Sequence, residues 1–164
     1  MAKGGIISAI HQGSLAEELE LVPGDKIISI NEQELTDIID LSFALADEEI
    51  EMLIEHENGE QEIIAFEKDM DEELGAEFES AVFGKIRQCA NNCYFCFVDQ
   101  VAPNMRDSLY IKDDDYRLSF LYGNFVTMTN MGPRDLERIH RLHLSPLYIS
   151  VHTTNPKLRG EMLR

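Results

Sequence analysis

The sequence predicts two consecutive units: a β-rich α+β module, followed by an α/β segment. Short apolar runs separated by turn residues fill the first half, whereas the second half contains a strand, a helix and a strand joined by short loops. Charge divides the chain at the same place. Residues 1–75 hold three lysines against 21 aspartates and glutamates, a net −18, so the rest of the 164-residue chain carries +1. We therefore expect a first domain over 1–68, an acidic linker over 69–75 and a second domain over 76–164.

Two helices and four strands are predicted in the first domain. Ser14 suits a helix N-cap, with Glu17 three residues on completing a capping box. Thr36 or Asp37 is expected to cap a second helix that runs to about Ala46. The strands are expected over 5–10, 26–30, 50–54 and 61–66, the last two joined by a hairpin at Asn58-Gly59.

The second domain is predicted to begin with strands and to continue as βα units. Strands are expected over 83–87, 116–122 and 147–151, and residues 125–129 extend the second of these or begin another. A helix is expected to start at Gly132-Pro133 and to run to about Leu142, and another occupies 159–164. A strand, a helix and a strand joined by short loops favour a parallel pair of strands.

The decisive segment is CANNCYFC, which spaces Cys89, Cys93 and Cys96 as C-x3-C-x2-C. An odd number of cysteines crowded into eight positions does not suit a disulfide framework, so we interpret them as metal ligands. Three thiolates on one loop can hold three corners of an iron–sulfur cube. No fourth cysteine exists, which leaves one iron open to bind a further ligand directly.

Two alternatives to the cluster stay open. The nearest is a zinc site in which His140, His143 or His152 adds a fourth ligand to the thiolates. The spacing favours the cluster, because structural zinc sites usually place a second ligand pair further along the chain. The other alternative is three inert buried cysteines, which so polar a segment does not favour.

Weaker candidates lie further along the chain. Ser150 and His152 follow a predicted strand, at the sheet edge that faces the active site in α/β folds. Gly123-Asn124 is a turn after another predicted strand. The run Asp113–Asp115 suits either a cation site or an exposed acidic turn, and the turn is the preferred interpretation.

The first domain resembles a PDZ domain of the bacterial protease type over residues 4–67. The resemblance rests on GGIISAIHQGSLAEELELVPGDKIISINEQELTDIIDLSFAL, with its turn-helix and its Leu-x-Pro-Gly-Asp signature. PDZ domains bind peptide C-termini by strand addition beside a carboxylate-binding loop. That loop would precede the strand over 5–10, where only residues 1–4 stand, so a structural or protein-docking role is expected instead.

The cysteine segment resembles the radical SAM superfamily, including the aromatic Phe95 just before the last cysteine. The wider runs CANNCYFCFVDQ, DDDYRLSFLYGNFVTMTN and LSPLYISVHTT resemble a bacterial group that joins a PDZ-like module, a radical SAM core and a C-terminal domain of unknown function. The resemblance implies a [4Fe-4S] cluster on Cys89, Cys93 and Cys96 and S-adenosyl-L-methionine on the open iron. It implies that Phe95 packs beside the adenine and that Gly123-Asn124 receives the amino group of the cofactor, although the family's usual turn is Gly-Gly-Glu.

This resemblance also implies a radical SAM oxidoreductase-type enzyme that takes one electron from a donor such as a flavodoxin or a ferredoxin and acts on an unknown substrate. A full barrel needs roughly 30 residues per βα unit, so residues 76–164 are expected to supply only the start of a partial barrel, as the N-terminal portion of a longer enzyme. A zinc-binding structural protein and a PDZ-type adaptor without catalysis are the alternative functions. Neither a membrane span nor a signal peptide is predicted, the acidic half disfavours nucleic acid, and a cytoplasmic location is expected.

Overall fold

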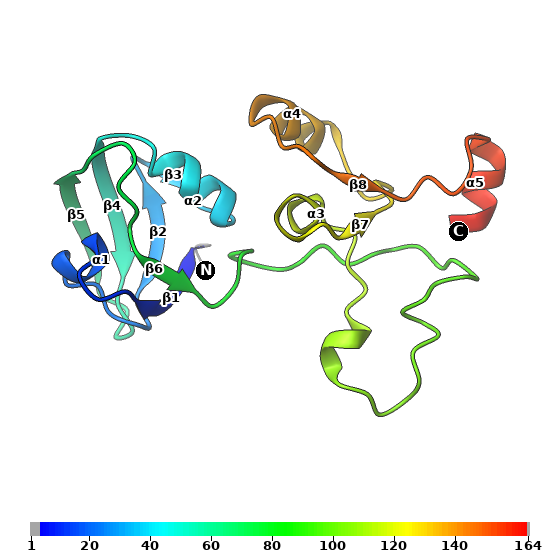
Figure 1. Cartoon of the computed structure of the whole chain (residues 1–164), viewed down its shortest axis with the longest axis horizontal. Coiled ribbons are helices and arrows are strands. Elements are labelled where there is room, and N and C mark those ends of the chain that lie inside the picture. The colour runs from blue at the N-terminus through cyan, green and yellow to red at the C-terminus, as the bar shows by residue number, and fades with distance from the viewer. Residues whose placement is uncertain (1–3, 164) are drawn as a thin grey trace. The chain divides into compact units, whose positions relative to one another are not determined.

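The computed structural model of the protein describes residues 4–163. These residues fold as two compact units, the first ending at Lys85 and the second beginning at Ile86 (Figure 1). None of the helices that they form is both long enough and apolar enough to cross a membrane. Residues 1–3, on which part of the prediction about a carboxylate-binding loop depends, lie outside the described range.

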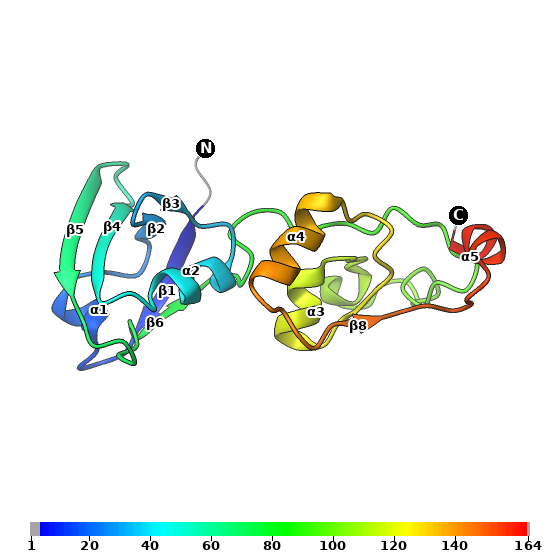
Figure 2. The same ribbon diagram turned by 90° about the horizontal axis from the view of Figure 1, so that it is seen from above.

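A twisted antiparallel sheet forms the first unit (Figure 2). The strand order is β5-β4-β2-β1-β6, and β3 also pairs with β2. The strands are β1 Gly5–Ile10, β2 Lys26–Ile30, β3 Gln33–Glu34, β4 Glu49–Glu55, β5 Gln61–Glu67 and β6 Ala76–Phe78. The four strands predicted for this module are confirmed, and the chain forms a β-rich PDZ-like region.

Alternation along β4 fixes which face of the sheet is buried. Ile50, Met52 and Ile54 are at most 3% exposed, while the side chains between them are more exposed. The hairpin to β5 turns at Gly59, whose φ of 85° lies in the left-handed region that glycine adopts without strain. The buried residues of β4 pack into the core with Ile7, Leu15, Ala16, Leu21, Ile27, Ile30, Leu35, Leu41, Ala44, Leu74 and Phe83.

Both helices of the first unit begin at side-chain caps. Ser14 Oγ accepts the Glu17 N–H at 3.4 Å at the start of α1 (Leu15–Glu18), whereas the Glu17 carboxylate accepts from Gly13 N–H rather than completing the box at Ser14. Asp37 caps α2 (Ile38–Ala44), accepting two backbone N–H groups at 3.1 Å each. Thr36 and Asp37 were the two predicted caps for α2, and the Asp37 carboxylate is the one that caps the helix.

Residues predicted as a linker pack into the first unit instead. Leu74 is only 5% exposed, and its carbonyl accepts the Ala16 N–H at 2.8 Å. Gly75 has φ +73° and lies so close to Ser14 that a Cβ there would be 2.2 Å from the serine Cβ. The next residues form β6, which adds to β1 antiparallel. This unit therefore continues beyond the predicted boundary at residue 68, and 76–78 belong to its sheet.

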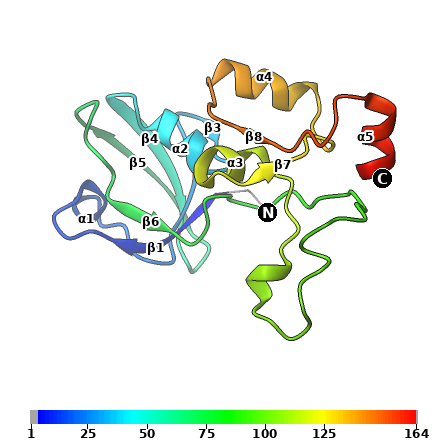
Figure 3. The same cartoon turned by 45° about the vertical axis from the view of Figure 1, so that its right-hand side comes forward.

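The second unit contains a parallel pair of short strands, β7 (Phe125–Val126) and β8 (Tyr148–Ile149). Helix α4 (Pro133–Arg141) connects them, as the predicted strand-helix-strand order requires. The other elements are the 3-10 helix η1 (Asp107–Tyr110), α3 (Tyr116–Tyr122) and α5 (Pro156–Leu163) (Figure 3). The region is α/β, and no barrel is formed by the residues the structure describes.

Two strands predicted for this part of the chain are wrong. Tyr116–Tyr122 is a helix, because Asp115 caps its first turn through the Arg117 N–H at 3.1 Å and Gly123 ends it in the left-handed conformation. Residues 83–87 form no strand. Phe83 is 7% exposed and packs into the core of the first unit, 5.4 Å from the ring of Phe78.

A charged and aromatic cluster joins α3, α4 and the chain that enters the second unit. The Arg87 guanidinium donates to both carboxylate oxygens of Asp135, at 2.5 and 2.8 Å. Its Cζ also lies 5.2 Å from the ring centroid of Tyr116, and Arg138 lies 5.9 Å from the same ring. Asp135 in turn accepts the Gly132 N–H at 2.8 Å at the start of α4. These contacts fix the segment just before the cysteines against two helices.

Candidate functional site

Cys89, Cys93 and Cys96 lie on one irregular loop of the second unit, as free and partly buried thiols. The loop is held at its start by a hydrogen bond of 2.8 Å from Cys89 N–H to the carbonyl of Lys112. A turn between the other two cysteines is closed by a bond of 3.0 Å from Cys96 N–H to Cys93 C=O. The structure thus places the three predicted ligands on one loop.

The three thiols of the loop affect one another electrostatically. Burial raises the pKa of the Cys93 thiol, and the nearby sulfurs of Cys89 and Cys96 raise it further. Lys112 lies beside them. Its ion pair with Asp99, at 2.7 Å, raises the pKa of the ammonium, and the Cys96 and Cys89 sulfurs add to that effect. A positive charge is therefore available next to thiolates, or next to a negatively charged group held by them.

The residues present fit an iron–sulfur cluster in kind but are not prearranged around a metal. Three thiols are the ligand type that such clusters require. However, within residues 4–163 no three side chains of His, Cys, Asp or Glu converge closely enough to hold a metal ion. A second feature at the loop points to a ligand. Asn130 Oδ1 is buried without a hydrogen-bond partner, while its amide nitrogen donates to the carbonyl of Gln88 at 3.4 Å.

A cleft of about 730 Å³ opens beside two of the cysteines. Cys93 and Cys96 line one wall, and Leu158 and Met162 of α5 line another. The cleft mixes apolar and polar groups, as pockets for small molecules do. It offers room for a ligand in contact with the sulfur atoms.

Three other predicted positions, Phe95, Ser150 and His152, lie near one end of the strand pair. The ring of Phe95 packs against that of His152, with centroids 4.8 Å apart. Ser150 follows β8, and its N–H donates to the carbonyl of Val126 at 2.8 Å. Arg159 of α5 donates to the carbonyls of residues 127, 150 and 151 at 2.7, 3.4 and 3.2 Å, which ties α5 to the carboxyl ends of both strands. Phe95, Ser150 and His152 thus lie at the carboxyl edge of the parallel pair.

The remaining predicted positions have different surroundings from those expected. Gly123 and Asn124 follow helix α3 rather than a strand, and Asn124 Nδ2 donates to Asp113 Oδ2 at 3.1 Å. The premise for a cofactor-binding turn after a strand is therefore wrong, and the role of the two residues stays a prediction. His140 and His143 are exposed, with ring centroids 6.3 Å apart.

The aspartate run is not an exposed turn. Asp114 is 2% exposed and Asp115 is fully buried. Burial by itself would raise the pKa of Asp115, but hydrogen bonds from the Arg117 side chain and from Arg87 N–H bring it below its ordinary value. The prediction failed because the fold brings the partners of these carboxylates from distant positions, Arg87 from 28 residues earlier and Thr127 from 13 residues later.

Sequence reasoning missed the polar residues around the first cysteine. Asn91, Thr127 and Thr129 form hydrogen bonds with one another, with Asp114 and with the Cys89 sulfur. The only signal in the sequence was a Thr-x-Thr pair directly after a strand, at the edge where functional groups of α/β folds gather.

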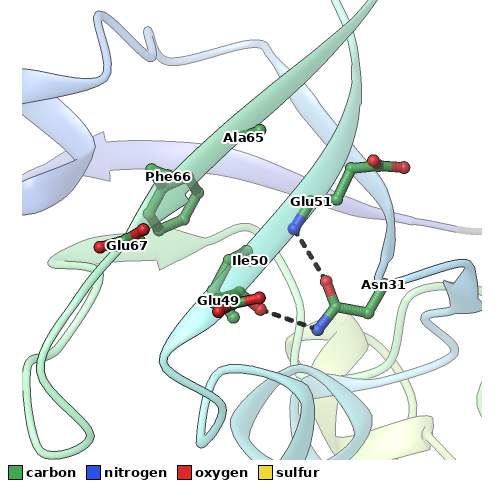
Figure 4. Close-up of a pocket in the computed structure, with 7 residues that line it drawn as sticks. All are labelled: Asn31, Glu49, Ile50, Glu51, Ala65, Phe66 and Glu67. Atoms are coloured by element: carbon green, nitrogen blue, oxygen red, sulfur yellow. Dashed lines mark hydrogen bonds between the residues drawn. The ribbon is translucent and has the colours of Figure 1, made fainter.

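The pockets of the first unit lack comparable chemistry. Figure 4 shows one beside β4 and β5, where Asn31 donates to the carbonyl of Glu49 at 3.1 Å and accepts the Glu51 N–H at 2.8 Å. Its other lining residues include Phe66 and Glu67. A second, of about 460 Å³, lies between α2 and the segment over 70–78. Neither contains a cysteine.

Comparison with protein families defines the class of this chain. Residues 6–56 match the PDZ domain family, in agreement with the sheet and helices of the first unit. Residues 68–164, more than half of the chain, match the Radical SAM-like domain family.

The chain belongs to the Radical SAM-like domain family and carries a PDZ domain ahead of that region. The predicted resemblance to a radical SAM protein with an N-terminal PDZ-like domain is therefore confirmed. A comparison with curated proteins found no match.

Proposed function

We propose that the second unit binds a [4Fe-4S] cluster through Cys89, Cys93 and Cys96, and S-adenosyl-L-methionine beside it, for radical chemistry on a substrate yet to be identified. The observation that carries the proposal is the set of three free thiols on one loop. Membership of the Radical SAM-like domain family supports it. When bound, the two groups supply a one-electron reductive cleavage of a carbon–sulfur bond.

The chain's own residues bind, orient and shield these groups. The three thiolates are the ligands, and Lys112, paired with Asp99, offsets part of their negative charge. Phe95, backed by His152, offers an aromatic face for the adenine. The cleft between the cysteine loop and α5 has room for a ligand, and its residues Leu158 and Met162 offer apolar contacts.

Three partners follow from the proposal. The cluster needs an electron donor, for which a flavodoxin or a ferredoxin has the appropriate chemistry. A substrate must reach the cleft. The PDZ domain is proposed to dock a protein rather than to act chemically, because its pockets hold none of the residues that the reaction requires.

The test is anaerobic reconstitution with iron and sulfide, followed by EPR of the dithionite-reduced protein. We expect about four irons and four sulfides per chain, with a signal that changes shape when S-adenosyl-L-methionine is added. Cys93→Ala should abolish the signal, while Ser150→Ala, outside the ligand set, should keep the iron content. Tight binding of zinc with no uptake of iron would contradict the proposal and indicate a zinc-stabilised structural protein.

A further inference from the structure

The sulfur of Cys89 is the one cysteine sulfur to which the described residues donate a side-chain amide hydrogen bond. Asn91 Nδ2 lies 3.4 Å from Cys89 Sγ, a distance at which N–H groups donate to sulfur. Hydrogen bonds to ligand sulfurs are one of the means by which a protein sets the reduction potential of an iron–sulfur cluster. The position of this single amide therefore has consequences for the cluster.

Two threonines hold the Asn91 amide in place. Its Nδ2 lies 3.0 Å from Thr127 Oγ1 and 2.9 Å from Thr129 Oγ1, and its Oδ1 accepts from Thr129 Oγ1 at 3.1 Å. The two hydroxyl oxygens are themselves 2.9 Å apart. An amide nitrogen has two hydrogens, so three acceptors compete for them: the two hydroxyl oxygens and the sulfur.

A buried carboxylate fixes the direction of these hydrogen bonds. Asp114, 2% exposed, accepts the Thr127 hydroxyl at 2.7 Å and the Thr127 N–H at 2.5 Å, and its Oδ2 lies 3.4 Å from Thr129 Oγ1. The Thr127 hydroxyl donates its one proton to Asp114 Oδ2. The Thr127 oxygen is then left as an acceptor for Asn91. The buried Asp114 carboxylate therefore orients the Asn91 amide through Thr127.

The segment that carries this carboxylate also holds the backbone of the same cysteine. Cys89 N–H donates to the Lys112 carbonyl at 2.8 Å, and Asp114 N–H donates to the Arg87 carbonyl at 3.0 Å. The result is one continuous hydrogen-bond network. It runs from the Cys89 backbone through residues 112–114 to the two threonines, and from them through Asn91 to the Cys89 sulfur. The Cys96 backbone N–H instead bonds within the loop, to the Cys93 carbonyl, and the Cys96 thiol interacts with Asp99.

We propose that Asn91 is a positioning residue that orients the Cys89 sulfur and raises the reduction potential of the cluster, with Thr127, Thr129 and Asp114 holding its amide. The inference rests on the proposed function for the identity of the group. An N–H donor stabilises the reduced cluster more than the oxidised one, because the reduced cluster carries the greater negative charge. Loss of the donor therefore makes reduction harder.

The experiment compares four variants of the full chain after reconstitution. Asn91→Ala removes the donor, and Asn92→Ala removes the same side chain from the next, exposed position of the loop. Thr129→Val removes a hydroxyl at nearly constant shape, and Thr129→Ser restores it. A redox titration followed by EPR gives the midpoint potential of each. We expect the ratio of reduced to oxidised cluster at a fixed applied potential to fall about tenfold in Asn91→Ala, a shift of about 59 mV for one electron.

Thr129→Val should shift the potential in the same direction and by less, while Asn92→Ala and Thr129→Ser should keep the potential of the unaltered protein. The same four proteins without iron give a second measurement, hydrogen exchange of the Cys89 amide, which we expect to be faster in Asn91→Ala and Thr129→Val only. Equal potentials and equal exchange in Asn91→Ala and Asn92→Ala would overturn the inference. If the unaltered chain binds no cluster, the proposed function fails, and the exchange measurement still decides whether Asn91 positions Cys89.

Discussion

Replacing Leu74 by alanine tests whether the acidic segment after β5 is part of the first unit. Leu74 is 5% exposed and belongs to the hydrophobic core. Truncation of a buried leucine costs roughly 2–5 kcal/mol, from lost transfer free energy and from the cavity that remains. At about 3 kcal/mol, and 4–8 °C per kcal/mol for a domain of this size, we expect the melting temperature of the first unit to fall by roughly 12–24 °C.

The matched control is Met70→Ala in the same segment, because Met70 is 66% exposed. Its effect should stay within about 0.5 kcal/mol, as for most surface substitutions. Hydrogen exchange of peptides from β1 and β2, followed against temperature in the full chain, reports the first unit by itself. Equal midpoints for Leu74→Ala and Met70→Ala would refute the reasoning, and residues 69–75 would then be a linker that contributes nothing to the core.

Three further predictions concern pH and backbone geometry. The Arg87 hydrogen bonds lower the pKa of Asp135, so this pair should stabilise the second unit above the unfolded pKa of about 4 and lose that contribution as the pH falls through the folded pKa. Asp135→Ala should lower the free energy of unfolding in urea at pH 7 by about 1.5–3 kcal/mol. An unchanged urea midpoint at that pH would contradict this prediction. Hydrogen bonding to Asp25 raises the pKa of His56, so the contribution of this pair to the stability of the first unit should be complete below about pH 6.5 and lost as the pH rises through the folded pKa. His56→Gln should remove that pH dependence from thermal unfolding of the first unit. Gly75→Ala should lower the stability of the first unit by more than about 1 kcal/mol in the same assay. Residue 75 has a left-handed backbone conformation that disfavours alanine, and the new Cβ would clash with Ser14, the cap of α1.

Local sequence patterns predicted the elements whose signals lie within the element itself. The alternation at Ile50, Met52 and Ile54 is sufficient to define β4, and a capping aspartate before an apolar helix face defined α2. The same reasoning gave the wrong element for Tyr116–Tyr122, because a run of seven residues rich in aromatic and apolar types fits the period of a strand as well as that of a helix. The caps at both ends decided in favour of helix.

The candidate site also has a part that local sequence patterns predicted and a part that they did not. The cysteine spacing is a local signal and predicted one loop with three thiols. Asn91 is one of two adjacent asparagines that look alike in sequence, and only the fold brings Thr127 and Thr129 within 3.0 Å of one of them. Leu74 was missed for a similar reason, because the acidic run holds two apolar residues, Met70 and Leu74, and nothing local shows that only Leu74 is buried.

The edges of the first sheet bear on how this protein behaves when it is concentrated. A sheet edge with free N–H and C=O groups can pair with another chain and start aggregation. On one side the chain covers β1 with β6, which is only three residues long. On the other side β5 ends at Glu67 and carries Glu62, so two copies that approached there would repel each other near neutral pH. Replacing both carboxylates by glutamine should remove that repulsion and make the chain more prone to associate through its sheet.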